Sequence, residues 1–465
     1  MKIFLATLVN RFINFGCKLF GKNGTQLPGY WVLKIFGDDI VNYVKYPKYV
    51  IAVTGSSGKG TTCNLIKHIL VDAGYSVALN EYGSNGLIGA TTLIFNNLKL
   101  NGEFKKDVLL LECDERHLQF IFPKKKPTHL IITNLTRDQP VRNGTPEIIF
   151  KEINKAIDDS IHLIINADDP LVSRLKLTHK GKITTYGIDK TKHSFKKPAL
   201  NNVDFAYCPK CHEKLEYSYY HYGHLGDYKC PRCNFYRGVP DCLATNINLD
   251  KQHITIDGNE IYINKNALYT AYATTAAYTL AKVLNIREDK ILYALNTDKI
   301  ASKRGKTYYI ANRPIMMLET KNENNLSYYQ SCEYIREQKG PKTVILGFEN
   351  VSRRYKENDL SWLYDVNFEL LNDVSIDKIF CIGRFRYDVK TRLEYAGIDK
   401  NKLVLVDDLN NLLNLVEEKS TGDIYTMVCF DMTAIIKKMI EEQEKWWKYC
   451  IYTTILWICM ENQLM

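Results

Sequence analysis

A glycine-rich stretch at residues 54–62 is the first group of residues whose types and spacing support chemistry. It reads Thr-Gly-Ser-Ser-Gly-Lys-Gly-Thr-Thr and directly follows a short β-branched run at residues 49–53. Glycines let backbone N–H groups point inward at phosphate oxygens, and the start of a following helix adds a favourable dipole. Lys59 would neutralise the β- and γ-phosphates, and Thr61 or Thr62 would place a hydroxyl on Mg²⁺. The candidate phosphate-binding residues are Gly55, Ser57, Gly58, Lys59, Gly60, Thr61 and Thr62.

Four cysteines in two Cys-Pro-x-Cys pairs form the second group. The predicted metal ligands are Cys208, Cys211, Cys230 and Cys233. This spacing is typical of a zinc ribbon, and four thiolates close a tetrahedral site, so Zn²⁺ would be structural. The ion would supply folding energy that a segment of about 30 residues cannot obtain from its own core. A role in binding nucleic acid is not favoured, because Lys210 and Arg232 are the only cations within the pairs.

Short apolar runs are predicted to form the parallel strands that position these groups. They cover residues 49–53, 107–111, 129–133 and 162–165, and each ends in a polar loop. Helical patterns lie between them, which indicates a doubly wound α/β sheet. Ligands bind at the carboxyl ends of such strands, so Glu112, the first acid after the second run, is the predicted Mg²⁺ ligand. A solvated loop charge is the alternative interpretation of that carboxylate.

Length and composition limit the class of protein. A chain of 465 residues is expected to hold about three domains. Lys plus Arg is 62 and Asp plus Glu is 52, and this modest excess of +10 does not indicate a dedicated nucleic-acid binder. The 13 cysteines occur without a clear export signal, which indicates reduced thiols in the cytoplasm.

Both ends of the chain are apolar. The stretch from Ile3 to Phe20 contains Arg11 and Lys18. Its apolar residues at helical spacing are Phe4, Leu5, Leu8, Phe12, Phe15 and Leu19. We expect an amphipathic helix docked on the domain that follows, with peripheral contact at the inner face of the membrane as the alternative. Residues 446–460 form a stretch shorter than the ~20 residues needed to cross a bilayer, so a core helix or a partner surface is expected there.

Histidine is absent after His253. Chemistry in the C-terminal part of the chain that needs an imidazole base must therefore take it from another chain.

The phosphate loop and the polar strand ends resemble the central ATPase domain of the Mur ligases. The stretches that carry this resemblance include Thr133-Asn134 and Asn166-Ala167-Asp168-Asp169. Mur ligases use ATP to convert a carboxylate into an acyl phosphate, which an amine then attacks. The resemblance implies ATP and Mg²⁺ as cofactors. It also implies that Asn134 contributes to the nucleotide site and that Asn166 and Asp169 lie near the adenosine.

A zinc ribbon inside such a domain narrows the resemblance to the MurT family, the synthetase subunits of lipid II isoglutaminyl synthases. The similar stretches are Gly-Thr-x-Leu-Pro-Gly at 24–29, Glu-x-Asp-Glu at 112–115, Thr-Asn-Leu-x-Arg-Asp-Gln at 133–139, Asp-x-Ser-Trp-x-x-Asp at 359–365 and Arg-Leu-x-Tyr-Ala-Gly at 392–397. The implied architecture is a docking segment (1–45), a Mur-ligase-type ATPase domain with a parallel sheet (46–300), its zinc-ribbon insertion (204–237) and a C-terminal α/β domain (305–465).

The resemblance implies a reaction and a partner. The reaction is ATP-dependent amidation of the D-glutamate α-carboxylate of the lipid II stem peptide to D-isoglutamine. The ammonia would come from glutamine through a separate GatD-like glutaminase subunit. Asp359 is expected to orient the histidine of that partner, with Asp365 as second choice. The alternative for Asp359 is a cap on a helix that starts near Ser361.

Several stretches depart from the MurT pattern. Residues 268–273 lack two amides that the family usually has near the nucleotide. Residues 302–306 keep Arg304 but have Lys306 in place of Glu, and residues 349–355 are eroded. Two alternatives therefore stay open: a diverged ligase that acts on another carboxylate, and a nucleotide-binding scaffold without catalysis.

Overall fold

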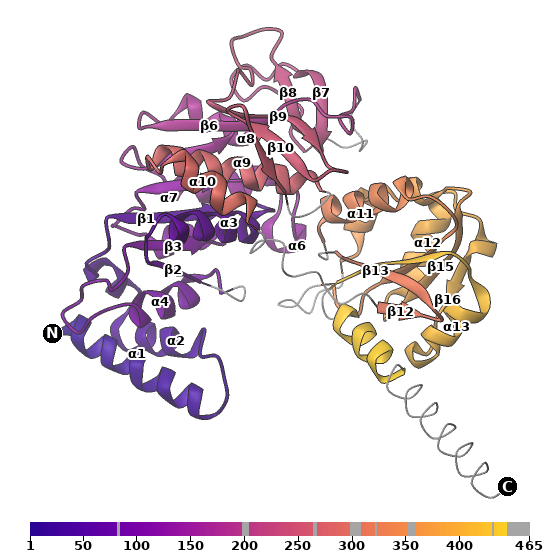
Figure 1. The fold of residues 1–465 in the computed structure, drawn as a ribbon, viewed down its shortest axis with the longest axis horizontal. Coiled ribbons are helices and arrows are strands. Elements are labelled where there is room, and N and C mark those ends of the chain that lie inside the picture. Colours follow the sequence, from indigo (N-terminus) through magenta and orange to yellow (C-terminus); the bar gives the residue numbers. More distant parts are fainter. Residues whose placement is uncertain are drawn as a thin grey trace, which may run out of the picture. The chain divides into compact units, whose positions relative to one another are not determined.

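The computed structural model describes residues 1–80, 84–197, 204–263, 267–297, 308–320, 323–351, 359–429 and 432–443. It divides into two compact units, shown in Figure 1. The first comprises residues 1–136 and 143–303, and the second comprises residues 137–142 and 304–465. The short segment 137–142 therefore belongs to the second unit although both its neighbours in sequence belong to the first.

A nine-stranded sheet of order β11-β10-β9-β6-β5-β4-β1-β3-β2 is the base of the first unit. Its strands are β1 (Tyr49–Thr54), β2 (Val77–Leu79), β3 (Val108–Glu112), β4 (His129–Ile132), β5 (His162–Asn166), β6 (Ile183–Ile188), β9 (Cys242–Asn248), β10 (His253–Ile256) and β11 (Asn259–Tyr262). Neighbours from β2 to β9 pair in parallel, and β10 and β11 add an antiparallel edge. The central strands are buried aliphatic runs, as expected for a sheet covered on both faces. The predicted parallel α/β sheet is confirmed.

Helices connect and cover these strands. They are α3 (Lys59–Asp72), α4 (Leu87–Asn96), α5 (Leu118–Ile121), α7 (Pro146–Ala156), α8 (Pro170–Ser173), α9 (Leu268–Val283) and α10 (Glu288–Asn296), whereas most of α6 (Pro140–Asn143) belongs to the second unit. Helix α3 packs against α9, which is buried along most of its length. The phosphate loop at the start of α3 thus lies on a rigid, deeply packed part of the unit.

The N-terminal segment forms two helices, α1 (Lys2–Leu19) and α2 (Leu27–Phe36), which pack on α4. The predicted amphipathic helix is confirmed, but the predicted docking face is wrong. The buried residues of α1 are Ala6, Thr7, Asn10 and Cys17. The apolar residues expected to dock, Phe4, Leu5, Leu8, Phe12, Phe15 and Leu19, are exposed. Small and polar side chains dock instead, together with the partly buried Ile3 and Val9. The Asn10 amide donates to Asn96 Oδ1 over 2.7 Å.

The cysteine-rich insertion lies between β6 and β9, which are adjacent in the sheet. It contains the hairpin β7 (Glu216–Tyr222) and β8 (Leu225–Lys229). Its buried side chains, including Phe205, Leu215, Tyr228 and Phe235, join the hydrophobic core of the first unit. The insertion is therefore packed on the ATPase-type sheet.

The second unit is built on a six-stranded sheet of order β12-β13-β17-β14-β15-β16. Its strands are β12 (Tyr308–Ile310), β13 (Arg313–Glu319), β14 (Lys342–Gly347), β15 (Ile376–Ile382), β16 (Leu403–Leu405) and β17 (Asp423–Val428). Its helices include α11 (Asn325–Glu337), α12 (Arg386–Tyr395) and α13 (Leu412–Lys419), and residues 432–443 are also helical. Strands β14 and β15 are largely buried. The apolar tail 446–460 and the junction 302–306 lie outside the described residues.

Among the helices that the structure describes, none is long and apolar enough to cross a bilayer.

Candidate nucleotide and metal sites

The glycine-rich loop joins β1 to α3 with a backbone that requires glycine at two positions. Gly58 caps α3 in the left-handed conformation, with φ 82°. Gly55 has φ 128°, and a Cβ there would lie 2.2 Å from Thr133 Oγ1. A side chain at position 55 would clash with Thr133, whereas at position 58 only the left-handed backbone disfavours one. The strand, the loop and the helix thus have the arrangement that the sequence predicts for phosphate binding.

Residues that follow β4 hold the glycine-rich loop in place through hydrogen bonds. The Ser56 N–H donates to the Asn134 carbonyl over 2.8 Å. The Ser57 N–H donates to Asn134 Oδ1 over 3.2 Å, and the Thr133 hydroxyl donates to the Ser57 carbonyl over 2.7 Å. Asn134, predicted as a nucleotide-site residue, thus holds the loop in shape, and its contact with nucleotide stays a prediction.

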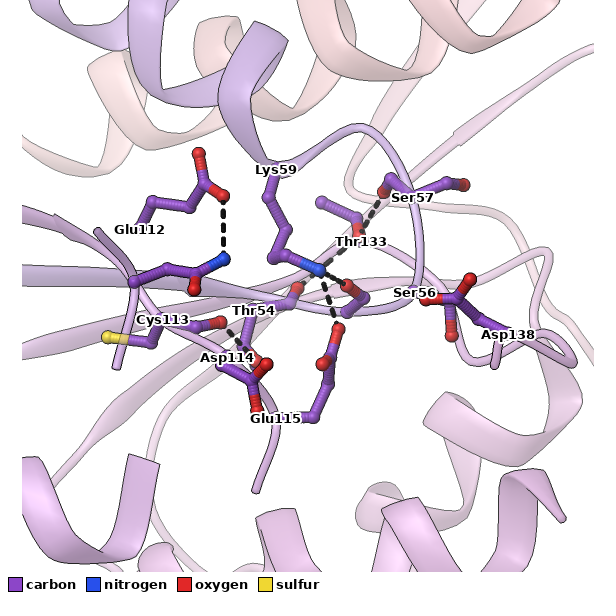
Figure 2. A network of polar contacts seen from close by, with 12 residues as sticks. Thr54, Ser56, Ser57, Lys59, Glu112, Cys113, Asp114, Glu115, Thr133 and Asp138 are labelled. Atoms are coloured by element: carbon purple, nitrogen blue, oxygen red, sulfur yellow. Dashed lines mark hydrogen bonds and ion pairs between the residues drawn. The ribbon is translucent and has the colours of Figure 1, made fainter. Parts of the chain in front are cut away.

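The Lys59 side chain contacts two groups near the glycine-rich loop, as Figure 2 shows. Its ammonium donates to the Gly55 carbonyl and forms an ion pair with Glu115 Oε1 at 2.6 Å. The exposed side-chain fractions are 12% for Lys59 and 5% for Glu115, so water screens this pair weakly. A phosphate that binds Lys59 must compete with the Glu115 carboxylate.

Glu112 lies at the end of β3, beside the start of α3. Its Oε1 accepts a hydrogen bond from the Asn85 amide over 3.2 Å. Its Oε2 is 3.1 Å from the position that a Cβ of Gly60 would take. The neighbouring hydroxyls differ: Thr62 is buried and donates to the Gly58 carbonyl, whereas Thr61 is half-buried. The Glu112 carboxylate therefore lies beside the start of α3, and its role as a Mg²⁺ ligand stays a prediction.

A small cavity adjoins the loop. The residues that line it are Ser57, Gly58, Thr62, Thr133, Asn134, Tyr186, Tyr222, Tyr269, Tyr272 and Ala273. Tyr222 comes from the insertion, and Tyr269, Tyr272 and Ala273 come from the first turns of α9. The stretch that lacks the family's amides, 268–273, therefore contributes directly to the wall beside the phosphate loop.

The polar residues after β5 are fully buried. The Asn166 amide donates to the Thr133 carbonyl over 3.0 Å. Asp169 caps α8, and its carboxylate also accepts from the Leu135 N–H at 2.7 Å and contacts His224 Nε2 at 3.2 Å. Asn166 and Asp169 thus brace the β4 and β5 ends, and their predicted proximity to adenosine is untested.

A buried ion pair links the insertion to this region. Arg237 Nε donates to Asp168 Oδ1 over 2.6 Å, and neither side chain is more than 8% exposed. Asp168 Oδ2 accepts from the Tyr272 hydroxyl at 2.7 Å and from the Ile188 N–H at 3.0 Å. Burial opposes the charge of Arg237, but Asp168 raises its pKa overall. Arg237 is therefore charged, and the pair ties the insertion, β6 and α9 together.

The four predicted ligand cysteines come together at one point. Their Sγ atoms all lie within 4.8 Å of one another, with 3.5 Å between Cys208 and Cys233 and 3.4 Å between Cys211 and Cys230. A tetrahedral ion with S ligands at ~2.3 Å needs about 3.8 Å between sulfurs. The N–H of Lys210 donates to Cys208 Sγ over 3.4 Å, and the N–H of Arg232 donates to Cys230 Sγ over 3.4 Å. The cluster fits a metal ion.

In the second unit, the two candidate triad aspartates differ in their surroundings. Asp359 is exposed and accepts from the Ser361 N–H at 2.9 Å, which lowers its pKa. Asp359 thus bonds the first N–H of the short 3-10 helix Ser361–Asp365, whose N-cap residue is Leu360, so the predicted alternative of a cap is wrong in its residue. Asp365 forms an ion pair with Arg137 Nη1 at 2.7 Å. Asp359 is thus the more accessible of the two carboxylates, and its catalytic role is untested.

Arg392, the first residue of the stretch 392–397 that resembles the MurT pattern, is buried. Its guanidinium donates to the carbonyls of Leu363 and Val366 over 3.1 and 2.8 Å and pairs with Glu369. Arg392 therefore holds in place the segment that carries Asp359.

Sequence reasoning gave no role to Glu115 or Arg237. The acidic residues within 112–115 could have pointed to Glu115. The distance between Glu115 and Lys59, however, depends on how β1 and β3 pair. Nothing in the sequence near Arg237 indicates a partner at Asp168, which is far away along the chain.

The parallel sheet with a phosphate loop between β1 and α3 defines a nucleotide-binding α/β protein. Family models agree and are more specific: the Mur ligase middle domain matches residues 53–225, and the MurT ligase C-terminal domain matches residues 322–434. The chain belongs to the Mur ligase family, in its MurT branch.

Curated relatives are similar over most of the chain. The subunit MurT of the glutamine-hydrolyzing lipid II isoglutaminyl synthase of Staphylococcus aureus is 28% identical over 390 residues, covering 82% of this chain and 84% of that protein. The MurT subunit of Streptococcus pneumoniae is 26% identical over 453 residues, covering 96% and 98%.

Solved structures show the same fold. A pseudomurein peptide ligase type C from Methanothermus fervidus has a TM-score of 0.64 at 20% identity, covering 87% of this chain and 80% of that one. MurF from Acinetobacter baumannii has a TM-score of 0.60 at 17% identity, covering 88% and 80%.

Proposed function

We propose that this chain is the synthetase subunit of a glutamine-hydrolysing ligase that amidates the D-glutamate α-carboxylate of the lipid II stem peptide. The observation that carries the proposal is the presence, in one chain, of a Mur ligase middle domain and a MurT C-terminal domain. The two MurT relatives bear the name of this reaction. ATP as co-substrate and the free cysteines suit a cytoplasmic reaction.

The reaction has two steps. A carboxylate oxygen of the substrate attacks the γ-phosphorus of ATP, and ADP leaves. The nitrogen of ammonia then attacks the acyl carbon, and inorganic phosphate leaves with the electron pair of the C–O bond. The chain's part is to bind and orient the phosphates and to stabilise the charge of the transferring group.

The phosphate loop supplies the main groups for this task. Lys59 is proposed to leave Glu115 and bind the β- and γ-phosphates, with support from the loop N–H groups that the β4 end keeps in position. Mg²⁺, when bound, would neutralise phosphate charge. Glu112 and Thr61 are proposed to hold it, which their positions beside the start of α3 support.

The cysteine cluster is proposed to bind one structural Zn²⁺. Four thiols close the coordination shell, so the ion has no open position for substrate. Its task is to hold the insertion that delivers Tyr222 to the cavity and Arg237 to Asp168.

Ammonia is proposed to come from a GatD-like glutaminase subunit. The sequence supports this because no histidine follows His253, whereas Asp359 is exposed for contact with a histidine of another chain. Asp359 would hold that imidazole in the correct tautomer and stabilise its cation.

The test is reconstitution of the chain with a GatD-like glutaminase, lipid II, ATP and glutamine. We expect ATP- and glutamine-dependent amidation, detected by mass spectrometry of the stem peptide. K59A should abolish it, whereas K151A, at an exposed lysine of α7, should not. Unchanged amidation in K59A would exclude the assigned ATP site.

The glutaminase step is tested separately. D359N should remove glutamine hydrolysis by the complex but leave ATP binding intact, and D365N should retain hydrolysis. The opposite pattern would move the triad role to Asp365.

The missing amides of 268–273 favour a second candidate function, a ligase of this family that acts on a different carboxylate. Ala273 lines the cavity where the family usually has an amide. ADP release that depends on Lys59 and responds to other carboxylates, but not to lipid II, would identify this function.

A further inference from the structure

The exposed face of α1 is apolar along the whole helix. We define the apolar stripe as Phe4, Leu5, Leu8, Phe12, Phe15 and Leu19. Their exposed fractions run from 41% at Leu8 to 79% at Phe12. Phe20, directly after the helix, is 83% exposed. Contiguous apolar surface of this kind usually marks an interaction site.

Helix α2, packed beside α1, adds exposed apolar and aromatic side chains. They are Leu27, Tyr30, Trp31 and Ile35, with exposed fractions from 38% to 55%. The ammonium of Lys34 lies 4.8 Å from the Trp31 ring centroid. Tryptophan, tyrosine and lysine together are typical of the boundary between lipid tails and headgroups. In Figure 1 the indigo helices α1 and α2 lie at the end of the first unit opposite the β7–β8 hairpin.

The charge of this segment has one sign. Residues 1–37 contain no Asp or Glu, and the first acid is Asp38. Their cations are Lys2, Arg11, Lys18, Lys22 and Lys34. At ~100° per residue, Arg11 and Lys18 fall on one edge of the stripe, and the buried face lies opposite it. Cations at the edge of an apolar face suit a surface that carries negative charge.

We propose that α1 and α2 form a peripheral membrane-binding surface that inserts the apolar stripe into a bilayer containing anionic phospholipid. The helix lies in the plane of the interface, because its opposite face is anchored to the first unit. Asn10 bonds Asn96 and the Arg11 guanidinium donates to the Leu98 carbonyl over 2.9 Å, so the stripe is held outward. A protein partner or a second copy of this chain would bury the apolar stripe equally well. Neither of them would explain why every charged residue of residues 1–37 is a cation.

This inference goes beyond the proposed reaction and stands without it, since it rests on exposure and charge. If the reaction is also correct, the surface brings the enzyme to a membrane-anchored substrate.

The test is flotation of the full-length chain with vesicles of phosphatidylglycerol and phosphatidylcholine, compared with phosphatidylcholine alone. We expect at least tenfold stronger partitioning to the anionic vesicles, reduced by high salt. F12S/F15S should reduce partitioning at least tenfold. The matched control V239S/V374S removes exposed valines elsewhere, 88% and 98% exposed, and should partition like wild type.

Charge is tested independently of the apolar residues. K18E/K22E should reduce binding to anionic vesicles at least tenfold, whereas K151E/K339E, with the same change of net charge at other exposed lysines, should reduce it much less. Thermal unfolding and nucleotide binding of each variant show that the fold and the ATP site are intact, so failure of this inference and of the proposed function are separable.

Wild type that does not float with anionic vesicles would overturn the proposal. So would equal binding by F12S/F15S. A change of sedimentation coefficient in F12S/F15S, without vesicle binding by wild type, would show that a second copy occupies the stripe. A large loss of thermal stability in F12S/F15S would show that the chain itself covers it.

Discussion

The ion pair between Arg237 and Asp168 should be essential for holding the insertion on the sheet. In R237M the Asp168 carboxylate stays fully buried and keeps two neutral donors, the Tyr272 hydroxyl and the Ile188 N–H. Removing one partner of a buried, hydrogen-bonded pair costs about 3–5 kcal/mol. The methionine retains most of the aliphatic volume, so little of this cost comes from a cavity. We therefore expect a loss of about 4 kcal/mol in local stability.

Hydrogen exchange measured by mass spectrometry is the appropriate assay, because it reports each region of a chain with two units separately. Peptides from β7, β8 and the β5 end should lose protection by roughly 10²- to 10⁴-fold in R237M, while peptides from β14 should be unchanged. R287M is the matched control. Arg287 pairs with Asp289 on the surface, at 77% and 57% exposure, so water screens the pair and its loss should leave the protection of all these peptides unchanged.

The double variant D168N/R237M completes the test. Because it removes both charges, it should be more stable than the sum of the single changes predicts, with a coupling of about 2 kcal/mol or more. Unchanged protection in R237M, or additive losses in the double variant, would refute the claim that an uncompensated buried charge is the cause.

Three further predictions concern the phosphate loop, the sheet and the cysteines. E115Q removes the carboxylate that competes with phosphate for Lys59. Titration calorimetry without Mg²⁺ should therefore show about tenfold tighter ATP binding, a gain of about 1.4 kcal/mol in binding free energy. Weaker binding would assign Glu115 a direct role in the nucleotide complex. Burial and the neighbouring His162 lower the pKa of His129 from 6.5 to about 4, so its neutral form stabilises the fold above pH 6.5 and this contribution is lost as the pH falls toward 4. Because water screens the partly exposed ring, we expect a loss of about 2 kcal/mol, and urea unfolding of H129Q should show a smaller pH slope than wild type. C208S or chelation should remove one bound metal ion per chain and abolish the exchange protection of β7 and β8, measured with elemental analysis; retained protection would show that the hairpin is stable without metal.

Local signals in the sequence predicted four central strands of the first sheet and the N-terminal helix. The aliphatic runs of β1, β3, β4 and β5 were identified because strands buried on both faces leave a contiguous apolar pattern. The cysteine cluster was also predictable from local signals, because each ligand pair is a short-range motif and tetrahedral coordination brings the two pairs together.

Contacts between residues that are far apart in the sequence were not predictable. The docking face of α1 was assigned to its large apolar residues, but small residues and Asn10 dock because the partner helix offers Asn96 at hydrogen-bond distance. The pairing of Lys59 with Glu115 depends on the register of β1 and β3, which no local pattern specifies. Asp169 was expected near adenosine from its motif alone, and its bonds to Leu135 and His224 needed the fold.

The position of the metal-binding insertion also affects the order in which the sheet is assembled. Parallel neighbours such as β6 and β9 require a crossover, which in most α/β proteins is a helix that forms from local contacts. Here the crossover is the cysteine-rich insertion, whose own fold would depend on an ion if the cysteine cluster binds the proposed Zn²⁺. Strands β9, β10 and β11 would in that case be added late, at a rate set by the supply of free metal in the cell. Metal starvation would then leave a chain with a complete phosphate loop and an unpaired β6 edge, a form exposed to aggregation and proteolysis.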